Sequence, residues 1–405
     1  MKETGLLAWI DERFPLSKMW DEHLAGYYAP KNLNFWYFFG ALSLLVLVNQ
    51  LVTGIWLAMY YKPSATDAFA SVEYIMRDVN YGWLLRYLHS TGASFFFIVV
   101  YLHMFRGMLY GSYRKPRELL WLIGMGIFLC LMIEAFMGYL LPWGQMSFWG
   151  AKVITSLFEA FPMVGPDLVE WIRGDYSISD VILNRFFALH VIAIPLVFLL
   201  LVWLHIIALH EVGSNNPDGI EIKKNKGSDG KPKDGIPFHP YYTVKDLFGT
   251  GVFLLIFFSV VFFWPDMGGY FLEAPNFEPA NPMKTPEHIA PVWYMTPYYA
   301  ILRAVPDKLL GVIAMFAAVL IFAFLPWLDR SPVKSIRYKG MLYKSMLSIF
   351  VISFVALGYL GLVPPTPVKT VLAQIFSFLY FAFFLTMPIY SKLDKTKPVP
   401  ERVTK

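Results

Sequence analysis

Two apolar stretches of the sequence each carry a pair of histidines whose spacing suits the binding of metal-centred cofactors. His89 and His103 are fourteen residues apart. On an α-helix, fourteen residues turn through about 1400°, within about 40° of four whole turns, and rise about 21 Å. The two imidazoles therefore share one helix face, with one near each surface of a bilayer. His190 and His205 are fifteen residues apart, and Pro195 between them could absorb the additional residue through a kink.

The four histidines predict two sites, stacked across the membrane, that each hold iron between two imidazoles. Both stretches run in the same direction through the membrane, so we expect His89 to face His190 near the outer side. His103 then faces His205 near the cytoplasmic side. Imidazole is a good iron ligand, and a haem with both axial positions filled is suited to electron transfer. The only cysteine is Cys130, and no Cys-x-x-Cys-His sequence occurs, so the prediction is two non-covalent haems b.

Glycines repeat the fourteen-residue spacing on two other apolar stretches. Gly40 and Gly54 form one pair. Gly124 and Gly138 form the other. A flat macrocycle needs helix backbone close by, and glycine leaves that room. Small residues also ease ordinary helix packing, but four positions at the spacing of the histidines favour cofactor binding.

Two arginines lie three residues outside the first histidine pair. Arg86 precedes His89, and Arg106 follows His103. Each could pair with haem propionates. The alternative is an interfacial arginine that extends its charged end to the membrane surface.

The composition identifies the kind of protein that positions these residues. The chain has 405 residues, of which 57% are hydrophobic and only 16% charged, and its mean hydropathy is +0.50. A soluble protein of this length would carry more charge, so we expect an integral membrane protein. The net charge of +5 is interpreted as loop charge that sets membrane topology, with no role in nucleic-acid binding.

The predicted fold class is an all-α integral membrane protein with eight transmembrane helices. A bilayer-spanning helix needs roughly 20 apolar residues, and eight stretches qualify, at about 34–60, 83–109, 117–140, 181–209, 247–264, 309–328, 345–363 and 370–390. We expect residues 1–215 to form a four-helix dihaem domain and residues 216–405 a C-terminal four-helix domain. The segment 211–245, rich in Gly, Lys and Asp, is the plausible linker.

Basic residues lie on alternate connections between the predicted spans. They cluster at 114–117, at 223–233, at 330–339 and beyond 392. This pattern follows the positive-inside rule and predicts that both termini are cytoplasmic. The polar, interrupted segments 145–178 and 266–306 then face outward, as surface loops with short amphipathic helices.

Together with these residues, four longer motifs make the chain resemble cytochrome b, the core subunit of the cytochrome bc complex (ubiquinol–cytochrome c oxidoreductase, complex III). The motifs are GYLLPWGQMSFWGAKVI (138–154), HEVGSNNP (210–217), FHPYYTVKDL (238–247) and PVWYMTPYYAILR (291–303). The resemblance covers nearly the whole chain in the right order. One continuous chain is similar to the respiratory form, and the fifteen-residue spacing with the style of the 210–247 loop suggests a multi-pass protein of a bacterial inner membrane.

The resemblance implies a mechanism, the Q cycle. Ubiquinol is oxidised at an outer site, and one electron passes to a Rieske iron–sulfur protein and on to a membrane-anchored c-type cytochrome. The other electron crosses the membrane through the two haems and reduces quinone at a cytoplasmic-side site. Proton release outside and uptake inside store a proton gradient. Members of this family form homodimers and contact lipids, and nucleic acid has no part in their function.

The resemblance also implies site residues. For the outer quinol site they are Phe136, Tyr139, Gly150, Pro291, Tyr294 and Tyr299. For the inner quinone site they are His210, Ser214 and Asp246, with Lys245 assisting. An imidazole and a carboxylate that flank a quinone could hydrogen-bond its carbonyls and deliver protons. Without the motifs, the two later tyrosines would equally suit an interfacial aromatic belt. The remaining histidines, His23, His239 and His288, are expected at the surface or in loops.

The chain departs from the family at Val292, where many relatives have glutamate. Valine cannot accept a quinol proton, so the role proposed for that glutamate is vacant. Glu134 lies four residues before Gly138, so about 40° of rotation separates them and Glu134 faces the bundle interior. A carboxylate there is costly unless it is paired or functional. We expect Glu134 to replace the missing glutamate, with a structural hydrogen bond or ion pair as the alternative.

Two other functions remain compatible with histidines in the membrane. One is a dihaem anchor subunit of a quinone-linked dehydrogenase, which would leave the segment 266–306 unexplained. The other is a proton-coupled transporter that uses histidines as a relay, which would have inverted repeats and no haem. A visible spectrum of the purified protein with a reduced b-type band would exclude the transporter.

Overall fold

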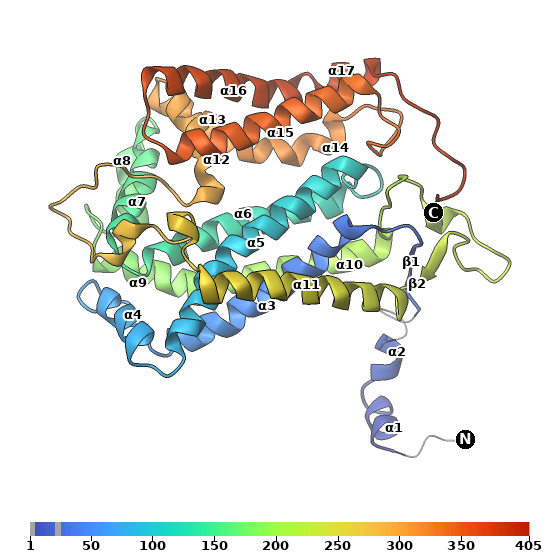
Figure 1. The fold of residues 1–405 in the computed structure, drawn as a ribbon, viewed down its shortest axis with the longest axis horizontal. Coiled ribbons are helices and arrows are strands. Elements are labelled where there is room, and N and C mark those ends of the chain that lie inside the picture. Colours follow the sequence, from blue (N-terminus) through green and yellow to red (C-terminus); the bar gives the residue numbers. More distant parts are fainter. Residues whose placement is uncertain (1–4, 21–25, 405) are drawn as a thin grey trace.

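The computed structural model describes residues 5–20 and 26–404. Within these ranges it is built almost entirely of helices, together with one small pair of strands (Figure 1). The predicted position of His23 lies outside the described residues.

The α-helices and strands follow one another in this order: α1 (Leu6–Asp11), α2 (Leu16–Trp20), β1 (Tyr28–Pro30), α3 (Phe38–Ala58), α4 (Ala68–Arg77), α5 (Gly82–Tyr110), α6 (Glu118–Leu140), α7 (Gln145–Ser156), α8 (Gly165–Arg173), α9 (Asp180–Ala188), α10 (Ile194–Val212), β2 (Gly235–Pro237), α11 (Tyr241–Phe263), α12 (Thr296–Ala304), α13 (Lys308–Leu320), α14 (Leu325–Leu328), α15 (Met341–Leu362), α16 (Pro367–Leu385) and α17 (Met387–Leu393).

Eight helical segments in the described part of the chain are long and apolar enough to cross a membrane. They are Phe35–Ala58, Gly82–Tyr110, Glu118–Leu140, Asp180–Val212, Tyr241–Phe263, Lys308–Leu328, Met341–Leu362 and Pro367–Leu385. Each overlaps one predicted stretch. The prediction of an all-α, multi-pass membrane protein with eight spans is therefore confirmed.

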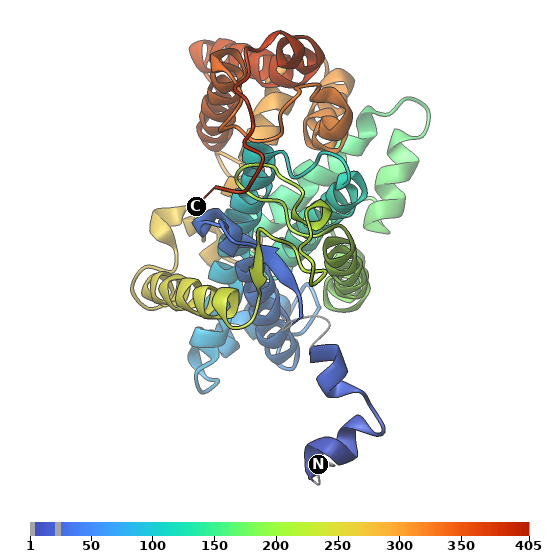
Figure 2. The same ribbon diagram turned by 90° about the vertical axis from the view of Figure 1, so that its right-hand side faces the viewer.

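The first four spans pack side by side as one bundle. In it α3 lies against α5, and α6 lies against α10. The helices α13, α15 and α16 form a second group, which α12 joins by contacting all three (Figures 1 and 2). The fifth span, α11, packs on α5 and α3 at the side of the first bundle. The division of the chain into two domains near residue 215 stays a prediction, and α11 marks where sequence order and spatial grouping differ.

The fourth span takes up its additional residue in a π-helical turn. This turn covers Leu189–Ala193 and joins α9 to α10. In a π-helix each N–H bonds to a carbonyl five residues earlier instead of four, so one more residue fits into the turn. Pro195 follows two residues after the turn and has no N–H for the carbonyl of Val191, four residues before it. The additional residue predicted to be absorbed at Pro195 is thus accommodated in the turn just before it, which contains His190.

The two segments predicted as outer loops form one layer at one end of the bundle. The first contains the short helices α7 and α8. Their connections cross-link: the backbone N–H of Gln145 donates to the Glu278 carbonyl over 3.0 Å, and the N–H of Ser147 donates to Oδ1 of Asn276 over 2.9 Å. The Gln145 side chain also accepts from the N–H of Asn281 at 2.8 Å. These bonds hold the two loops together over the ends of α5 and α6.

The predicted linker 211–245 is a folded part of the opposite end. Its strand β2 pairs antiparallel with β1, so it is tied to the N-terminal segment. Asp234 adds a second tie: its carboxylate accepts two hydrogen bonds from the Arg402 guanidinium, at 2.7 and 2.9 Å, and lies 3.0 Å from Nζ of Lys31. One buried carboxylate therefore joins the linker to segments near both ends of the chain.

We predict that Asp234→Asn lowers stability by about 1–3 kcal/mol, because charged hydrogen bonds are lost. Arg402 and then Lys31 hold the pKa of Asp234 at about 2, below its usual 3.8. A lowered pKa stabilises the fold at neutral pH, and this contribution is lost as the pH falls through that range. The difference in thermal unfolding midpoint between wild type and variant should therefore close between about pH 4 and pH 2. Equal midpoints at pH 7 would contradict the assignment; Asp229→Asn, at an exposed position in the same segment, is the matched control.

Candidate functional site

The structure brings the four membrane histidines together in the two predicted pairs. The ring centroids of His89 and His190 are 6.2 Å apart, with the rings nearly perpendicular. Those of His103 and His205 are 6.4 Å apart. Two imidazoles that share one metal ion, with metal–nitrogen bonds of about 2 Å, have centroids roughly 6 Å apart. Both separations therefore suit an iron ion between the rings.

The outer pair is oriented by partners at its Nδ1 atoms. His89 Nδ1 lies 2.9 Å from the Thr53 hydroxyl. His190 Nδ1 lies 3.0 Å from the backbone carbonyl of Glu134 and 2.9 Å from its carboxylate. Metal-bound histidines usually donate their second ring N–H to such acceptors, which fixes the tautomer. With Nδ1 engaged in this way, Nε2 is the atom left to bind a metal.

Each of the four predicted glycines faces one of the histidines. A Cβ atom added to Gly40 would lie 3.2 Å from the His103 ring, and one added to Gly54 would lie 3.1 Å from the His89 ring. For Gly124 the distance to the His205 ring is 3.2 Å. For Gly138 the distance to the His190 ring is 2.5 Å, closer than real Cβ contacts allow. Any side chain at these positions would therefore intrude on an imidazole.

The inner pair is surrounded by polar atoms that lack partners. Within the described residues, His205 Nδ1 and Arg106 Nε are buried without a hydrogen-bond partner. The Arg106 guanidinium stacks 4.6 Å from the Tyr37 ring centroid, and one of its Nη atoms lies 3.5 Å from His103 Nδ1. A half-buried cation with a buried, unmet donor is suited to an anionic group such as a propionate.

The residues therefore fit two bis-histidine haems. Paired imidazoles, glycines that give room for a flat ring and an arginine with a free donor all agree with that cofactor. No group of three or more His, Cys, Asp or Glu side chains suited to a metal ion is found in the part of the chain that the structure describes.

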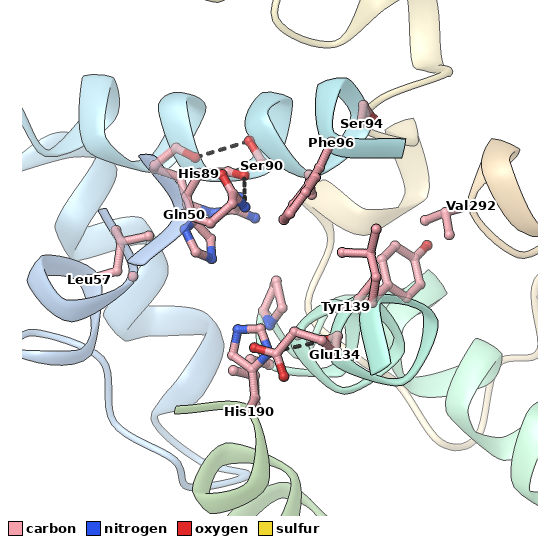
Figure 3. A pocket seen from close by; sticks show the side chains of 18 of the residues that line it. Gln50, Leu57, His89, Ser90, Ser94, Phe96, Glu134, Tyr139, His190 and Val292 are labelled. Atoms are coloured by element: carbon pink, nitrogen blue, oxygen red, sulfur yellow. Dashed lines mark hydrogen bonds and ion pairs between the residues drawn. The ribbon is translucent and has the colours of Figure 1, made fainter. Parts of the chain in front are cut away.

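The outer histidine pair lies in one cavity with several residues of the predicted quinol site. The cavity has a volume of about 250 Å³. Figure 3 shows His89 and His190 on opposite sides of the open space, with Tyr139 and Val292 at one end of it. Arg86 also lines this cavity.

Glu134 lines the same cavity and points toward His190 (Figure 3). Its Oε1 lies 2.9 Å from His190 Nδ1, whereas its Oε2 is buried without a partner among the described residues. This contact corresponds to the alternative of a structural hydrogen bond or ion pair. The assignment of Glu134 as the acceptor of a quinol proton stays a prediction.

The predicted outer-site residues divide into two groups. Tyr294 lines the cavity of the outer pair and stacks on Phe97 at 3.7 Å between centroids. Pro291 lines a neighbouring cavity of about 600 Å³ in the outer layer. Tyr139 also lines the first cavity, so three of the six line a cavity. The other three are not among the residues that line these two cavities: Phe136, Gly150 and Tyr299. Their roles stay predictions.

Glu273 is a functional candidate that the sequence did not reveal. It lies between α11 and α12, in the outer layer. Its carboxylate Oε2 accepts a hydrogen bond of 3.0 Å from the Tyr139 hydroxyl. Burial raises the pKa of the Glu273 carboxyl from 4.5 to about 7, although the hydrogen bonds from its own backbone N–H and from Tyr139 oppose the shift. The residue belongs to no recognised motif, so only its three-dimensional contacts identify it.

At the opposite end, two of the predicted inner-site residues, His210 and Ser214, contact Tyr27. The Tyr27 ring packs 4.7 Å from the His210 ring, and its hydroxyl lies 3.1 Å from the Ser214 hydroxyl. Asp246 is half-buried on the first turns of α11, and the exposed Lys245 beside it lies 5.2 Å from the ring of Tyr242. Sequence patterns gave no reason to select Tyr27, which lies outside the apolar stretches.

His239 and His288 lie outside the membrane spans, as expected. His239 precedes α11, where its ring meets that of Trp20 at 5.6 Å and its Nδ1 lies 3.3 Å from the Thr243 hydroxyl. His288 lies in the outer layer and bonds to the Leu362 carbonyl over 2.8 Å.

Comparisons with known proteins agree with this geometry. The family model described as Cytochrome b/b6/petB matches residues 24–213, and that described as Cytochrome b(C-terminal)/b6/petD matches residues 279–381. Cytochrome b of Allochromatium vinosum is 67% identical over 100% of this chain and 99% of its own length. Cytochrome b of Rhodospirillum rubrum is 51% identical over 98% of this chain and 96% of its own.

A solved structure gives the same result. A chain of the "Hyperthermophilic respiratory Complex III" superposes with a TM-score of 0.89 at 44% identity, over 95% of this chain and 98% of that one. These likenesses leave the transporter and the dehydrogenase anchor without support. From the fold, the histidine pairs and these relatives together, we conclude that the chain belongs to the cytochrome b family, the haem b-binding electron-transfer membrane subunits of bc1-type respiratory complexes.

Proposed function

We propose that the chain catalyses both quinone reactions of a Q cycle. Ubiquinol is oxidised at the outer cavity, quinone is reduced near His210 and Asp246 at the opposite end, and the coupling of the two reactions moves protons across the membrane. In this proposal the chain is the quinone-reacting subunit of a quinol–cytochrome c oxidoreductase.

The observation that carries the proposal is the sharing of one cavity by a histidine pair and quinol-site residues. His89, His190, Tyr139 and Tyr294 all line it. A quinol bound beside the aromatic residues would lie next to the outer redox centre, which short-range electron transfer requires. A site built for binding alone would not need paired imidazoles.

Two haems b, one per histidine pair, would supply the one-electron path between the two quinone sites. His89 and His190 would hold the outer haem, and His103 and His205 the inner one. Arg106, with its unpaired Nε, would hold a propionate of the inner haem, and Arg86 one of the outer haem. The glycines facing the imidazoles would leave room for the macrocycles: Gly40, Gly54, Gly124 and Gly138.

At the inner site, the side chains would orient quinone and deliver protons. His210 and Asp246 supply an imidazole and a carboxylate, which are suited to proton transfer to the two quinone oxygens. Ser214 would add a hydroxyl donor, and Lys245 would hold the site electropositive. Tyr27 would position His210 and Ser214, because it contacts both.

The proposed setting follows from the same function. The chain would lie in a bacterial inner membrane. Both termini would lie in the cytoplasm, because connections rich in Lys and Arg stay on the cytoplasmic side of a membrane. Its partners would be a Rieske iron–sulfur protein and a membrane-anchored c-type cytochrome, in a homodimeric complex with bound lipids.

We predict that His205→Leu in the assembled complex leaves one haem per chain, because leucine cannot bind iron. His103→Leu should have the same effect. Haem per chain from the visible spectrum of the reduced protein measures this. His239→Leu, which alters a histidine beside Trp20 outside the spans, should retain two haems. Two haems per chain in both inner-pair variants would disprove the ligand assignment.

A second prediction concerns the inner quinone site. Asp246→Asn removes the proton-delivering carboxylate while preserving its shape, so re-oxidation of the inner haem by the quinone pool should slow by about 10²-fold. Flash or stopped-flow spectroscopy of haem oxidation measures this step. Reduction of the haems from the outer side should remain at the wild-type rate. A defect in that outer step instead would show that Asp246 is wrongly assigned.

A further inference from the structure

The proposed outer quinol site needs a group that takes up a proton, and Val292, which lines its cavity, cannot do so. Among the described residues, two carboxylates line this cavity or hydrogen-bond to a side chain that lines it. Glu134 lines the cavity of the outer pair but has Oε1 against His190 Nδ1. Glu273 approaches from the outer layer through its hydrogen bond with Tyr139.

The Glu273–Tyr139 hydrogen bond lies on the boundary between the two outer cavities. Tyr139 lines the cavity of the outer histidine pair, whereas Glu273 lines the neighbouring cavity of about 600 Å³. Tyr270 and Trp293 line both. The second cavity is large enough for many water molecules, since one water needs only about 10–15 Å³ of such space. Glu273 therefore borders a space with room for water, which could take a proton from it.

We infer that Glu273 accepts a proton from quinol at the outer site and passes it to water in the neighbouring cavity of about 600 Å³. This inference rests on the proposed quinol oxidation. Each quinol releases two electrons and two protons. The iron–sulfur partner would take one electron and one proton, and the outer haem would take the other electron. As one quinol O–H bond breaks, its proton forms an O–H bond on Glu273. The transfer is either direct or through Tyr139. In the second case the Tyr139 hydroxyl gives its own proton to Glu273 and takes the quinol proton in its place.

The ionisable groups around Glu273 are compatible with this role. Tyr139 donates a hydrogen bond to the Glu273 carboxylate. Tyr294 lies close enough for the negative charge of Glu273 to oppose ionisation of the Tyr294 phenol. Burial also raises the pKa of Tyr294, so it stays a neutral phenol and does not compete as a base. The other ionisable residues lining the neighbouring cavity are Tyr270, Glu278, Lys284, Glu287 and His288. With a pKa of about 7, Glu273 both accepts and releases protons near neutral pH.

The test is Glu273→Gln in the assembled complex, which keeps the shape and removes the basicity. Quinol oxidation should fall by about 10²-fold with both haems retained, because general-base catalysis contributes on this scale. In the wild type the rate should rise with pH through about 7, as Glu273 loses its proton. This limb of the pH profile should disappear in the variant. Glu273→Asp, which keeps a carboxylate, should recover part of the rate.

A readout independent of turnover is the infrared band of a protonated carboxyl group. It should titrate near pH 7 in the wild type and be absent from Glu273→Gln. Glu287→Gln, in the same cavity wall, is the matched control and should retain both the rate and the band.

A Glu273→Gln complex with wild-type turnover and pH profile would overturn the inference while leaving quinol oxidation intact. If Glu134→Gln loses the rise of the rate with pH and Glu273→Gln keeps it, the inference is overturned and Glu134 is the proton acceptor. Absence of quinol oxidation in the wild type would overturn the proposed function and this inference together.

Discussion

The close approach of helix backbone to an imidazole, repeated at four glycines, is the constraint on which the rest of the molecule depends. In each case a single Cβ atom would lie within about 3 Å of a histidine ring. The helices α3 and α6 must therefore keep a fixed rotation about their own axes relative to α5 and α10, at both ends of the bundle. The other helices pack around this four-helix frame, and the outer layer and the folded linker close its two ends.

The sequence was sufficient for the parts of the fold that depend on repeated spacing. Hydropathy located all eight spans, because hydrocarbon requires long apolar helices with internally bonded backbones. The fourteen- and fifteen-residue spacings paired the histidines correctly, because the helical repeat converts sequence distance directly into direction. The grouping of helices was less predictable: α11 begins the C-terminal half of the sequence but packs on α5 and α3.

The candidate site could be predicted only where its residues lie on helices. Glu273 and Tyr27 lie in irregular segments, whose conformation is set by contacts such as the bond between Ser147 N–H and Asn276. Such long-range side-chain contacts leave no periodic pattern in the sequence. For Glu134, which lies on a helix, the sequence predicted the direction of the side chain but not its partner. Helical geometry correctly placed Glu134 toward the bundle interior. The contact of its carboxylate with the His190 ring became visible only in the structure.

The π-helical turn at Leu189–Ala193 affects how this chain should be compared with its relatives. The turn separates the fourth span into two helices, α9 and α10, which both pack against α6. In an alignment with a member whose two histidines are fourteen residues apart, the single-residue gap belongs inside this turn. A gap placed elsewhere between His190 and His205 would shift part of the span by one position and assign lipid-facing residues to the cofactor side.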